Sequence, residues 1–225
     1  MTTAAYIPAR ASSVRLPGKN VRPLAGVPLV RRTVDVALDA QHAGLVDRVV
    51  LDTDDEQIAA VGAGAEIRMR PETLRGTDVR VVDLLRAWLA ATPDVDLVCV
   101  LMATSPLRTL KHLTESRAAL RDDVDGVLSL TQFTQDIGHA VFVPARDRTV
   151  QMHYPTAGAR AVLRDAGKHD GTAAWYRCAA LLTLPPHENV YALRLAPYWV
   201  PTLESVDVDT ERDFLIADAL LRRRG

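Results

Sequence analysis

The fold of this chain is decided by one stretch near its start, Ala4-Ala5-Tyr6-Ile7-Pro8-Ala9-Arg10-Ala11-Ser12-Ser13-Val14-Arg15-Leu16-Pro17-Gly18-Lys19-Asn20. Its first four residues form a short apolar run that predicts a buried strand, which we expect to end at Pro8 because proline cannot donate to a sheet ladder. A long polar segment with small side chains, hydroxyls and cations follows. Open α/β sheets bind ligands beyond the carboxyl ends of their strands, so we expect this segment to line a ligand site.

The chemistry of this segment favours a phosphate ligand. Small side chains let backbone N–H groups approach an anion, and long cations neutralise it. An irregular connection of this length also favours a functional loop over a solvated surface loop. A Walker A loop is excluded, because its first glycine would fall at Ser13 and Asn20 stands in place of the metal-binding hydroxyl. We therefore expect a nucleoside triphosphate to contact Ala9, Arg10, Ser12, Ser13, Arg15, Lys19 and Asn20.

The composition bounds the remaining possibilities. At 225 residues, 48% hydrophobic and 24% charged, the chain suits one large core, so we expect a single domain over residues 1–225. A net charge of −1 offers no extended field for nucleic acid or an anionic membrane, and we expect neither as a partner. The sequence shows neither a signal-peptide pattern nor an apolar run of membrane-spanning length, which favours the cytoplasm.

Beyond the first loop the chain alternates between strand and helix patterns. Apolar periodicity predicts helices over residues 28–40, 56–62, 79–91, 110–120 and 211–223. Strands are predicted over residues 47–51, 66–69, 97–101, 126–130, 140–143, 179–184 and 191–195. Asp54 or Asp55 is expected to cap the second helix, and Asp78 the third. This alternation indicates an α/β fold with a mostly parallel sheet.

The opening stretch, continued through Pro23-Leu24-Ala25-Gly26-Val27-Pro28-Leu29, resembles the signature loop of the cytidylyltransferases that make CMP-activated sugar acids. These are the CMP-N-acylneuraminate synthetases and their relatives for other nonulosonic acids and 3-deoxy-octulosonate. Three further segments match in the same order, so the resemblance runs through nearly the whole chain: Asp52-Thr53-Asp54-Asp55, Thr104-Ser105-Pro106-Leu107-Arg108 and Ser205-Val206-Asp207-Val208-Asp209-Thr210-Glu211. The resemblance implies a three-layer α/β/α fold of the nucleotide-diphospho-sugar transferase kind.

The matched segments imply further ligand contacts. In the resembling family an Arg-Pro pair places an arginine near the nucleotide phosphates, which gives Arg70 that role, although a solvated arginine is an even alternative. Thr104 and Ser105 offer hydroxyls to the nucleotide after an apolar strand. Relatives that act on sialic acid carry Gln where this chain has Met102, and Asn-Gly where it has Thr172-Ala173. We expect Met102, Thr172 and Tyr176 at the acceptor, and an acceptor other than N-acetylneuraminate.

Asp207 and Asp209 are the candidate metal ligands. In an extended segment their spacing points both carboxylates to one side, as a hard cation bridging phosphates requires. The alternative is a surface turn that caps the last helix, and the matched Thr210-Glu211 context favours metal binding. We expect Mg²⁺ or Mn²⁺ as the cofactor.

The region at about 150–171 loses clear periodicity. The resemblance implies that it is an excursion that packs a two-fold dimer and reaches the partner's active site. It also carries apolar side chains that one chain does not obviously bury, which favours a homodimer. Its charged side chains either contact an acidic substrate or form a solvated face, and the solvated face is favoured for any one of Arg160, Arg164, Lys168 and His169.

Together with these observations, the resemblance implies a cytidylyltransferase that transfers CMP from CTP to an acidic small-molecule acceptor, expected to be a nonulosonic acid, and releases pyrophosphate. Arg10, Lys19 and Asp209 are the expected catalytic residues, because this chemistry needs positioning and charge neutralisation rather than a nucleophile. One alternative is a cytidylyltransferase that activates a phosphonate or another small acid. A more distant one is a non-catalytic nucleotide-binding homologue, since Val14 stands where relatives carry a loop lysine.

Overall fold

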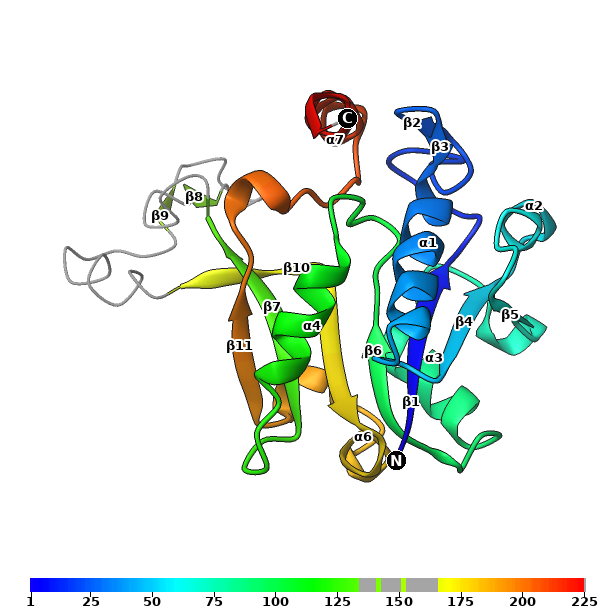
Figure 1. Cartoon of the computed structure of the whole chain (residues 1–225), viewed down its shortest axis with the longest axis vertical. Coiled ribbons are helices and arrows are strands. Elements are labelled where there is room, and N and C mark those ends of the chain that lie inside the picture. Colours follow the sequence, from blue (N-terminus) through cyan, green and yellow to red (C-terminus); the bar gives the residue numbers. More distant parts are fainter. Residues whose placement is uncertain (134–140, 143–150, 153–165, 225) are drawn as a thin grey trace.

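A seven-stranded sheet forms the centre of the computed structural model, which describes residues 1–133, 141–142, 151–152 and 166–224 (Figure 1). The strand order is β11-β7-β10-β6-β1-β4-β5, and β10 alone in this sheet runs antiparallel to its neighbours. Its strands are β1 (Thr2–Ala9), β4 (Arg48–Thr53), β5 (Glu66–Met69), β6 (Val95–Val100), β7 (Gly126–Gln132), β10 (Gly167–Arg177) and β11 (Leu195–Trp199). The expected mostly parallel sheet is confirmed.

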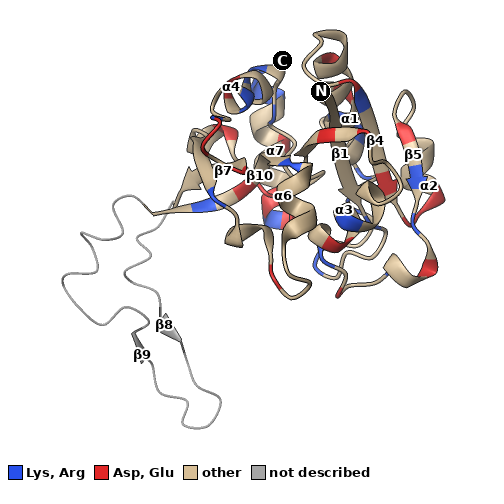
Figure 2. Ribbon diagram, turned by 90° about the horizontal axis from the view of Figure 1, so that it is seen from below, with Lys and Arg blue, Asp and Glu red and all other residues tan. Residues whose placement is uncertain are grey.

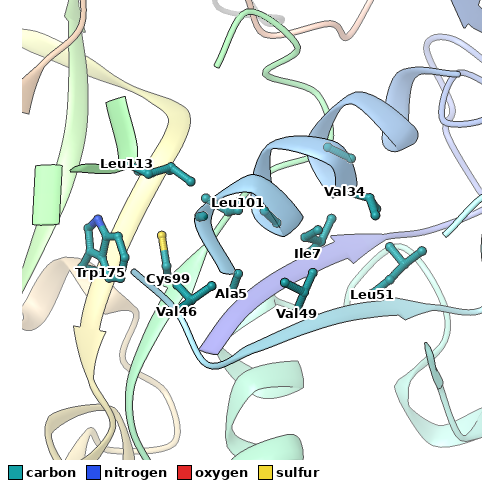
Figure 3. Close-up of a cluster of buried hydrophobic side chains, with 14 of the residues drawn as sticks. Ala5, Ile7, Val34, Val46, Val49, Leu51, Cys99, Leu101, Leu113 and Trp175 are labelled. Atoms are coloured by element: carbon teal, nitrogen blue, oxygen red, sulfur yellow. The ribbon is translucent and has the colours of Figure 1, made fainter. Parts of the chain in front are cut away.

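Helices cover both faces of this sheet, which gives three layers (Figure 1). Helices α1 (Leu29–His42) and α4 (Leu110–Ala118) pack on one face, and α3 (Val81–Leu89) and α6 (Cys178–Thr183) on the other. Figure 3 shows the core under α1 and α4, where Ile7, Leu51 and Trp175 come from three different strands. The remaining described elements are α2 (Glu56–Ala60), α7 (Glu211–Arg224), β2 (Pro23–Leu24), β3 (Val27–Pro28), β8 (Val141–Phe142), β9 (Gln151–Met152), and the 3₁₀ turns Glu72–Leu74, Val190–Ala192 and Thr202–Glu204.

Strand β1 continues through Pro8 to Ala9, so the expected end at Pro8 is wrong. In a parallel ladder, every second residue of a strand forms its hydrogen bonds to the same neighbouring strand. The carbonyl of Tyr6 accepts from the amide of Leu101, which lies on the β6 side. The missing N–H of Pro8 therefore falls on that side. The ladder between β1 and β6 already ends at the Tyr6–Val100 pair, so the proline deprives the sheet of no hydrogen bond there. The gap that opens beyond this pair is where the cavity described below begins.

Two expected strands are also wrong. Residues 178–183 form helix α6, whose Cys178 and Leu181 enter the core one helical turn apart. A short apolar run has no periodicity that separates a strand from a buried helix. The other wrong strand is the one expected at 191–195. Val190–Ala192 form a 3₁₀ turn there, and strand β11 begins only at Leu195.

Strand β10 was not predicted from the sequence, because its first residues include Lys, His and Asp. In the structure its ladder with β7 is interrupted between His169 and Ala174. Strand β8 covers only the centre of the expected strand at 140–143, whose end residues lie outside the described part of the chain. Helix α3 begins at Val81 with Arg80 as its N-cap, so Asp78 does not cap it, whereas Asp55 does cap α2 through the amide of Ile58.

The C-terminal segment packs against the first loop. Leu16, Leu24 and Phe214 belong to one small apolar cluster, which joins the segment at 206–221 to the hairpin β2–β3 and the loop before it. Residues 25 and 26 form the hairpin turn and both have positive φ, as a two-residue hairpin turn requires. This packing brings Asp207 and Asp209 to the carboxyl edge of the sheet.

Charged residues are interspersed over the described elements rather than gathered on one of them, as Figure 2 shows, which agrees with the net charge of −1. Among the described residues no helix is long and apolar enough to span a bilayer. Most of the expected dimerisation excursion lies outside the described residues, and its end, from Gly167, is the first half of β10.

Candidate active site

A cavity of about 580 Å³ lies at the carboxyl edge of the sheet, where β1 and β6 end beside each other. The chain crosses from β1 to β4 on one side and returns to β6 on the other, which makes this gap the topological switch point of the sheet. The cavity is lined by Pro8, Ala9, Arg10, Lys19, Asn20, Arg70, Thr77–Val82, Leu84, Leu85, Val100, Met102–Thr104, His169–Gly171, Ala174, Tyr176, Asn189–Tyr191, Asp207 and Asp209.

Lys19 joins the first loop to the C-terminal segment. Its Nζ donates to the carbonyl of Val208 at 2.7 Å and to Oδ1 of Asp209 at 2.8 Å, and the residue is only 8% exposed. Arg15, which is exposed, pairs with the other carboxylate oxygen of Asp209. Both oxygens of Asp209 therefore contact a cation from the first loop.

Arg10 and Asn20 face the same cavity. Arg10 donates to the carbonyl of Thr77 at 3.1 Å, which fixes its guanidinium across the mouth of the site. Asn20 is buried and donates through Nδ2 to the carbonyl of Arg10 at 2.8 Å. Its Oδ1 is buried and has no partner among the described residues. A buried acceptor without a donor is uncommon in folded proteins, so this amide is a candidate contact for a ligand.

Arg70 enters the cavity from the end of β5 and is almost fully buried. Its Nε donates to Oδ1 of Asp52, and one terminal nitrogen donates to the carbonyl of Asp52 at 3.1 Å. The same carboxylate also accepts from Arg68, whose Nη1 lies 3.3 Å from the hydroxyl of Tyr6. Burial, followed by the Asp52 charge, raises the pKa of Tyr6, so this hydroxyl stays neutral.

Asp207 is the second carboxylate on this wall. Burial raises the pKa of Asp207, and the nearby charge of Asp209 acts in the same direction, whereas a hydrogen bond with Thr104 opposes them. Within the described residues no group of three or more His, Cys, Asp or Glu side chains could hold a metal alone. Two carboxylates do fit Mg²⁺, which usually takes one or two from the protein and the rest of its ligands from phosphates and water.

The wall opposite the first loop is formed by β6 and β10. Met102 and Tyr176, which the sequence predicts to contact the acceptor, line it together with His169, Asp170 and Gly171. Burial lowers the pKa of His169, so its ring is neutral near pH 7. Its Nδ1 lies 3.3 Å from the hydroxyl of Tyr191, and its buried Nε2 has no partner in the described part of the chain.

Arg108 stabilises the turn at Gly171 through hydrogen bonds to backbone carbonyls. This buried guanidinium donates to the carbonyls of Met102 and Gly171, each at 2.8 Å, to the carbonyl of Thr172, and to the Thr33 hydroxyl at 3.0 Å. Burial lowers the pKa of Arg108 to about 10, which still leaves it charged at neutral pH. Arg108 therefore fixes the backbone of this wall, at Met102 and Gly171, from outside the cavity.

Most of the residues expected from the sequence come together in this cavity: Ala9, Arg10, Lys19, Asn20, Arg70, Met102, Thr104, Tyr176, Asp207 and Asp209. The other five do not line it. Ser12, Ser13 and Arg15 lie outside the lining, and Ser105 and Thr172 are buried against Asp170. Their contacts to a ligand remain predictions that the cavity lining does not support.

Sequence reasoning missed Asp170 and Gly171 and took His169 for a solvated residue. The available signal was the Asp-Gly pair, which favours a turn or bulge inside a strand. Gly171 has φ +73°, and its position next to Met102 places this bulge at the carboxyl end of β6.

Comparison with known families agrees with this geometry. The family model described as cytidylyltransferase matches residues 4–142, which is more than half of the chain. The chain therefore belongs to the cytidylyltransferase family, and the resemblance stated from its motifs is confirmed.

Curated relatives and solved structures extend this result. The chain is 41% identical to the CMP-N,N'-diacetyllegionaminic acid synthase of Legionella pneumophila over 51% of this chain and 53% of the relative. It is 27% identical to the N-acylneuraminate cytidylyltransferase of Streptococcus agalactiae, over 96% of this chain and 52% of the relative. The chain thus spans about half the length of these relatives. A structure of CMP:2-keto-3-deoxy-manno-octonic acid synthetase complexed with CTP, 21% identical, superimposes over the full length of both chains with a TM-score of 0.72, which confirms the fold.

Proposed function

We propose that this protein transfers CMP from CTP to an acidic small molecule, best a nonulosonic sugar acid, and releases pyrophosphate. The observation that carries the proposal is one cavity in which the cations Arg10, Lys19 and Arg70 face the carboxylates Asp207 and Asp209. Triphosphate binding needs the cations, and a bridging divalent cation needs the carboxylates. Membership of the cytidylyltransferase family supports cytidine as the nucleoside.

The nucleotide binds along the first loop in this proposal. Lys19 and Arg10 neutralise phosphate oxygens, and Asn20, which lines the same cavity, contacts the nucleotide beside them. The hydroxyl oxygen of the acceptor attacks the α-phosphorus in line, and the proton of that hydroxyl is released to solvent. The bond from that phosphorus to the β-phosphate oxygen breaks, and pyrophosphate leaves with the charge that Lys19 and Arg10 stabilise.

Asp207 and Asp209 would hold Mg²⁺ or Mn²⁺ in this site. A bound divalent cation neutralises phosphate charge and orients the reacting groups. Both oxygens of Asp209 contact Lys19 and Arg15 in this structure. We infer that Arg15, which is exposed, moves aside when the cation and nucleotide enter together, whereas Lys19 stays within reach of the phosphates.

The acceptor lies against Met102, Tyr176 and Gly171 in this proposal. Thioether and aromatic surfaces offer no strong hydrogen bond to a polyhydroxylated acid, and an unpaired polar group costs roughly 1–3 kcal/mol. A deoxygenated sugar acid, which presents fewer hydroxyl groups to this surface, is therefore preferred over N-acetylneuraminate. In this proposal the protein acts as a homodimer in the cytoplasm.

The proposal is tested by pyrophosphate release from each of CTP, UTP, ATP and GTP with Mg²⁺. The acceptors are legionaminate-type acids, N-acetylneuraminate, octulosonate and small phosphonates. We expect release with CTP and a sugar acid only, and loss of release in Lys19→Met. A release that is unchanged in Lys19→Met, or independent of the acceptor, would overturn the proposal. Sedimentation at micromolar concentration tests the dimer, and a monomer would contradict it.

A further inference from the structure

Asp52 lies at the centre of a buried charge cluster that the reaction chemistry does not explain by itself. Asp52 is fully buried at the carboxyl end of β4, and its two carboxylate oxygens bond two different arginines, Arg68 and Arg70. A carboxylate without exposure is rare in proteins unless it is paired, and here it is paired twice. Only one of the two arginines, Arg70, lines the cavity.

The sheet register explains why these groups meet. Asp52 pairs with Arg68 across the β4–β5 ladder, and Arg70 follows two residues later on the same face. The backbone of Arg70 is fixed as well, because its amide donates to the carbonyl of Thr53 at 2.8 Å. The carbonyl of Arg70 accepts from Nε of Arg75 at 3.0 Å. Arg70 is therefore held at its main chain and along one edge of its guanidinium.

The rest of that guanidinium is not bonded within the described residues. Asp52 engages Nε and Nη2, and the described residues offer no hydrogen-bond partner to Nη1 of Arg70. Arg68 and Arg70 carry two positive charges and Asp52 carries one negative charge, so the cluster has a net charge of one positive unit at the cavity wall. An anion in the cavity is the partner that this charge lacks.

We propose that Asp52 is a positioning residue that aims Arg70 at a phosphate group of the nucleotide; this rests on the proposed function. Asp52 itself touches no ligand. It acts by holding Nε and Nη2, so that Nη1 points into the cavity while the cluster keeps its positive charge. Arg68 balances the second carboxylate oxygen and does not reach the ligand.

A positioning role predicts that Asp52→Asn changes the affinity for the nucleotide in the opposite direction from the change in charge alone. Asp52→Asn removes a negative charge next to the cavity, so Coulomb attraction alone would tighten the binding of an anion. Loss of the fixed geometry instead weakens it, on the order of 10-fold or more, since a misplacement of about 1 Å can cost 100-fold. Arg70→Met should weaken binding to a similar extent. Adding Asp52→Asn to Arg70→Met should then cause no further loss, because both changes remove the same contact.

The experiment is calorimetric titration of Mg·CTP into the full-length wild type, both single variants and the double variant, with thermal unfolding recorded for each. Arg48→Gln serves as the matched control, because it breaks a salt bridge with Glu66 on the same two strands but away from the cavity. Arg70→Lys covers the case in which Asp52→Asn does not fold. Lysine keeps the positive charge but lacks the planar guanidinium with its several N–H donors, and we expect it to weaken CTP binding to the same extent.

The results separate this inference from the proposed function. If wild type does not bind CTP, the nucleotide assignment fails, and the role of Asp52 fails with it. If wild type binds CTP and folded Asp52→Asn binds equally or more tightly, the proposed function stands and the positioning role is overturned. Additive losses in the double variant, or full affinity in Arg70→Lys, would overturn it as well.

Discussion

Gly171→Ala tests the close packing of Gly171 against Met102 and Ser105 at the edge of the cavity. A Cβ at this position would lie 2.8 Å from Oγ of Ser105 and 2.9 Å from Cβ of Met102. Neither neighbour can retreat easily, because Ser105 donates to Asp170 at 2.7 Å and Arg108 holds the carbonyl of Met102 at 2.8 Å. The positive φ of +73° costs an alanine about 1–2 kcal/mol, and the overpacking about 1–3 kcal/mol more.

The expected loss is therefore about 2–5 kcal/mol, which for a chain of this size lowers Tm by about 5–15 °C. The matched control is Gly44→Ala, because Gly44 has φ +71° and nothing within 4 Å of the added Cβ. It should lose only the backbone part, about 1–2 kcal/mol. Differential scanning calorimetry of both variants gives the difference. Equal Tm values would refute the close packing of Gly171 against Met102 and Ser105.

Three further predictions concern Lys19, the carboxylate pair and a buried histidine. Lys19→Met should lower turnover by at least about 100-fold. It should also lower the free energy of unfolding by about 1.5–3 kcal/mol, because the substitution removes the hydrogen bonds of Lys19 to both Asp209 and Val208. Steady-state kinetics and urea unfolding measure the two effects, and a variant with normal turnover would contradict the role of Lys19. Asp209→Asn should lose activity at saturating Mg²⁺, and wild type should be inactive in excess EDTA; full activity in EDTA would show that the pair is only a turn. Burial lowers the pKa of His112 below its ordinary value of 6.5, although Glu204 at 3.0 Å opposes the shift. The unfolded state then binds more protons below pH 6.5, so the stability is fully present above that pH and is lost as the pH falls from 6.5 toward the lower folded pKa. His112→Gln should flatten this fall in urea unfolding between pH 7 and 5, and an unchanged slope would contradict it.

The fold was largely predictable because most of the central parallel strands contain a short apolar run. Residues 97–101 carry no polar side chain, as expected of a strand that is buried on both faces, and β6 is such a strand. Strand β5 was predicted with its observed bounds. Helix α6 could not be separated from a strand, since the apolar residues at 178–184 suit either structure, and only its packing against β6 and α3 decides between them.

The cationic and carboxylate side of the candidate site was also predictable, because its residues lie in contiguous motifs. Lys19 and Asp209 are far apart in the sequence, and no sequence pattern shows that they bond each other; the apolar cluster around Leu24 and Phe214 brings them together. The Asp52–Arg70 contact depends in the same way on the register between β4 and β5. Such register is a tertiary property, whereas motifs and strand patterns are local.

The most direct test of the proposed function follows the α-phosphate. CTP labelled with ³²P at that phosphate is incubated with the protein, Mg²⁺ and a legionaminate-type acid, and the products are separated by anion-exchange chromatography. We expect the label in a new CMP-acceptor diester and unlabelled pyrophosphate in equal amount. Label that stays in CTP, or that appears only as free CMP, would contradict transfer of CMP to an acceptor.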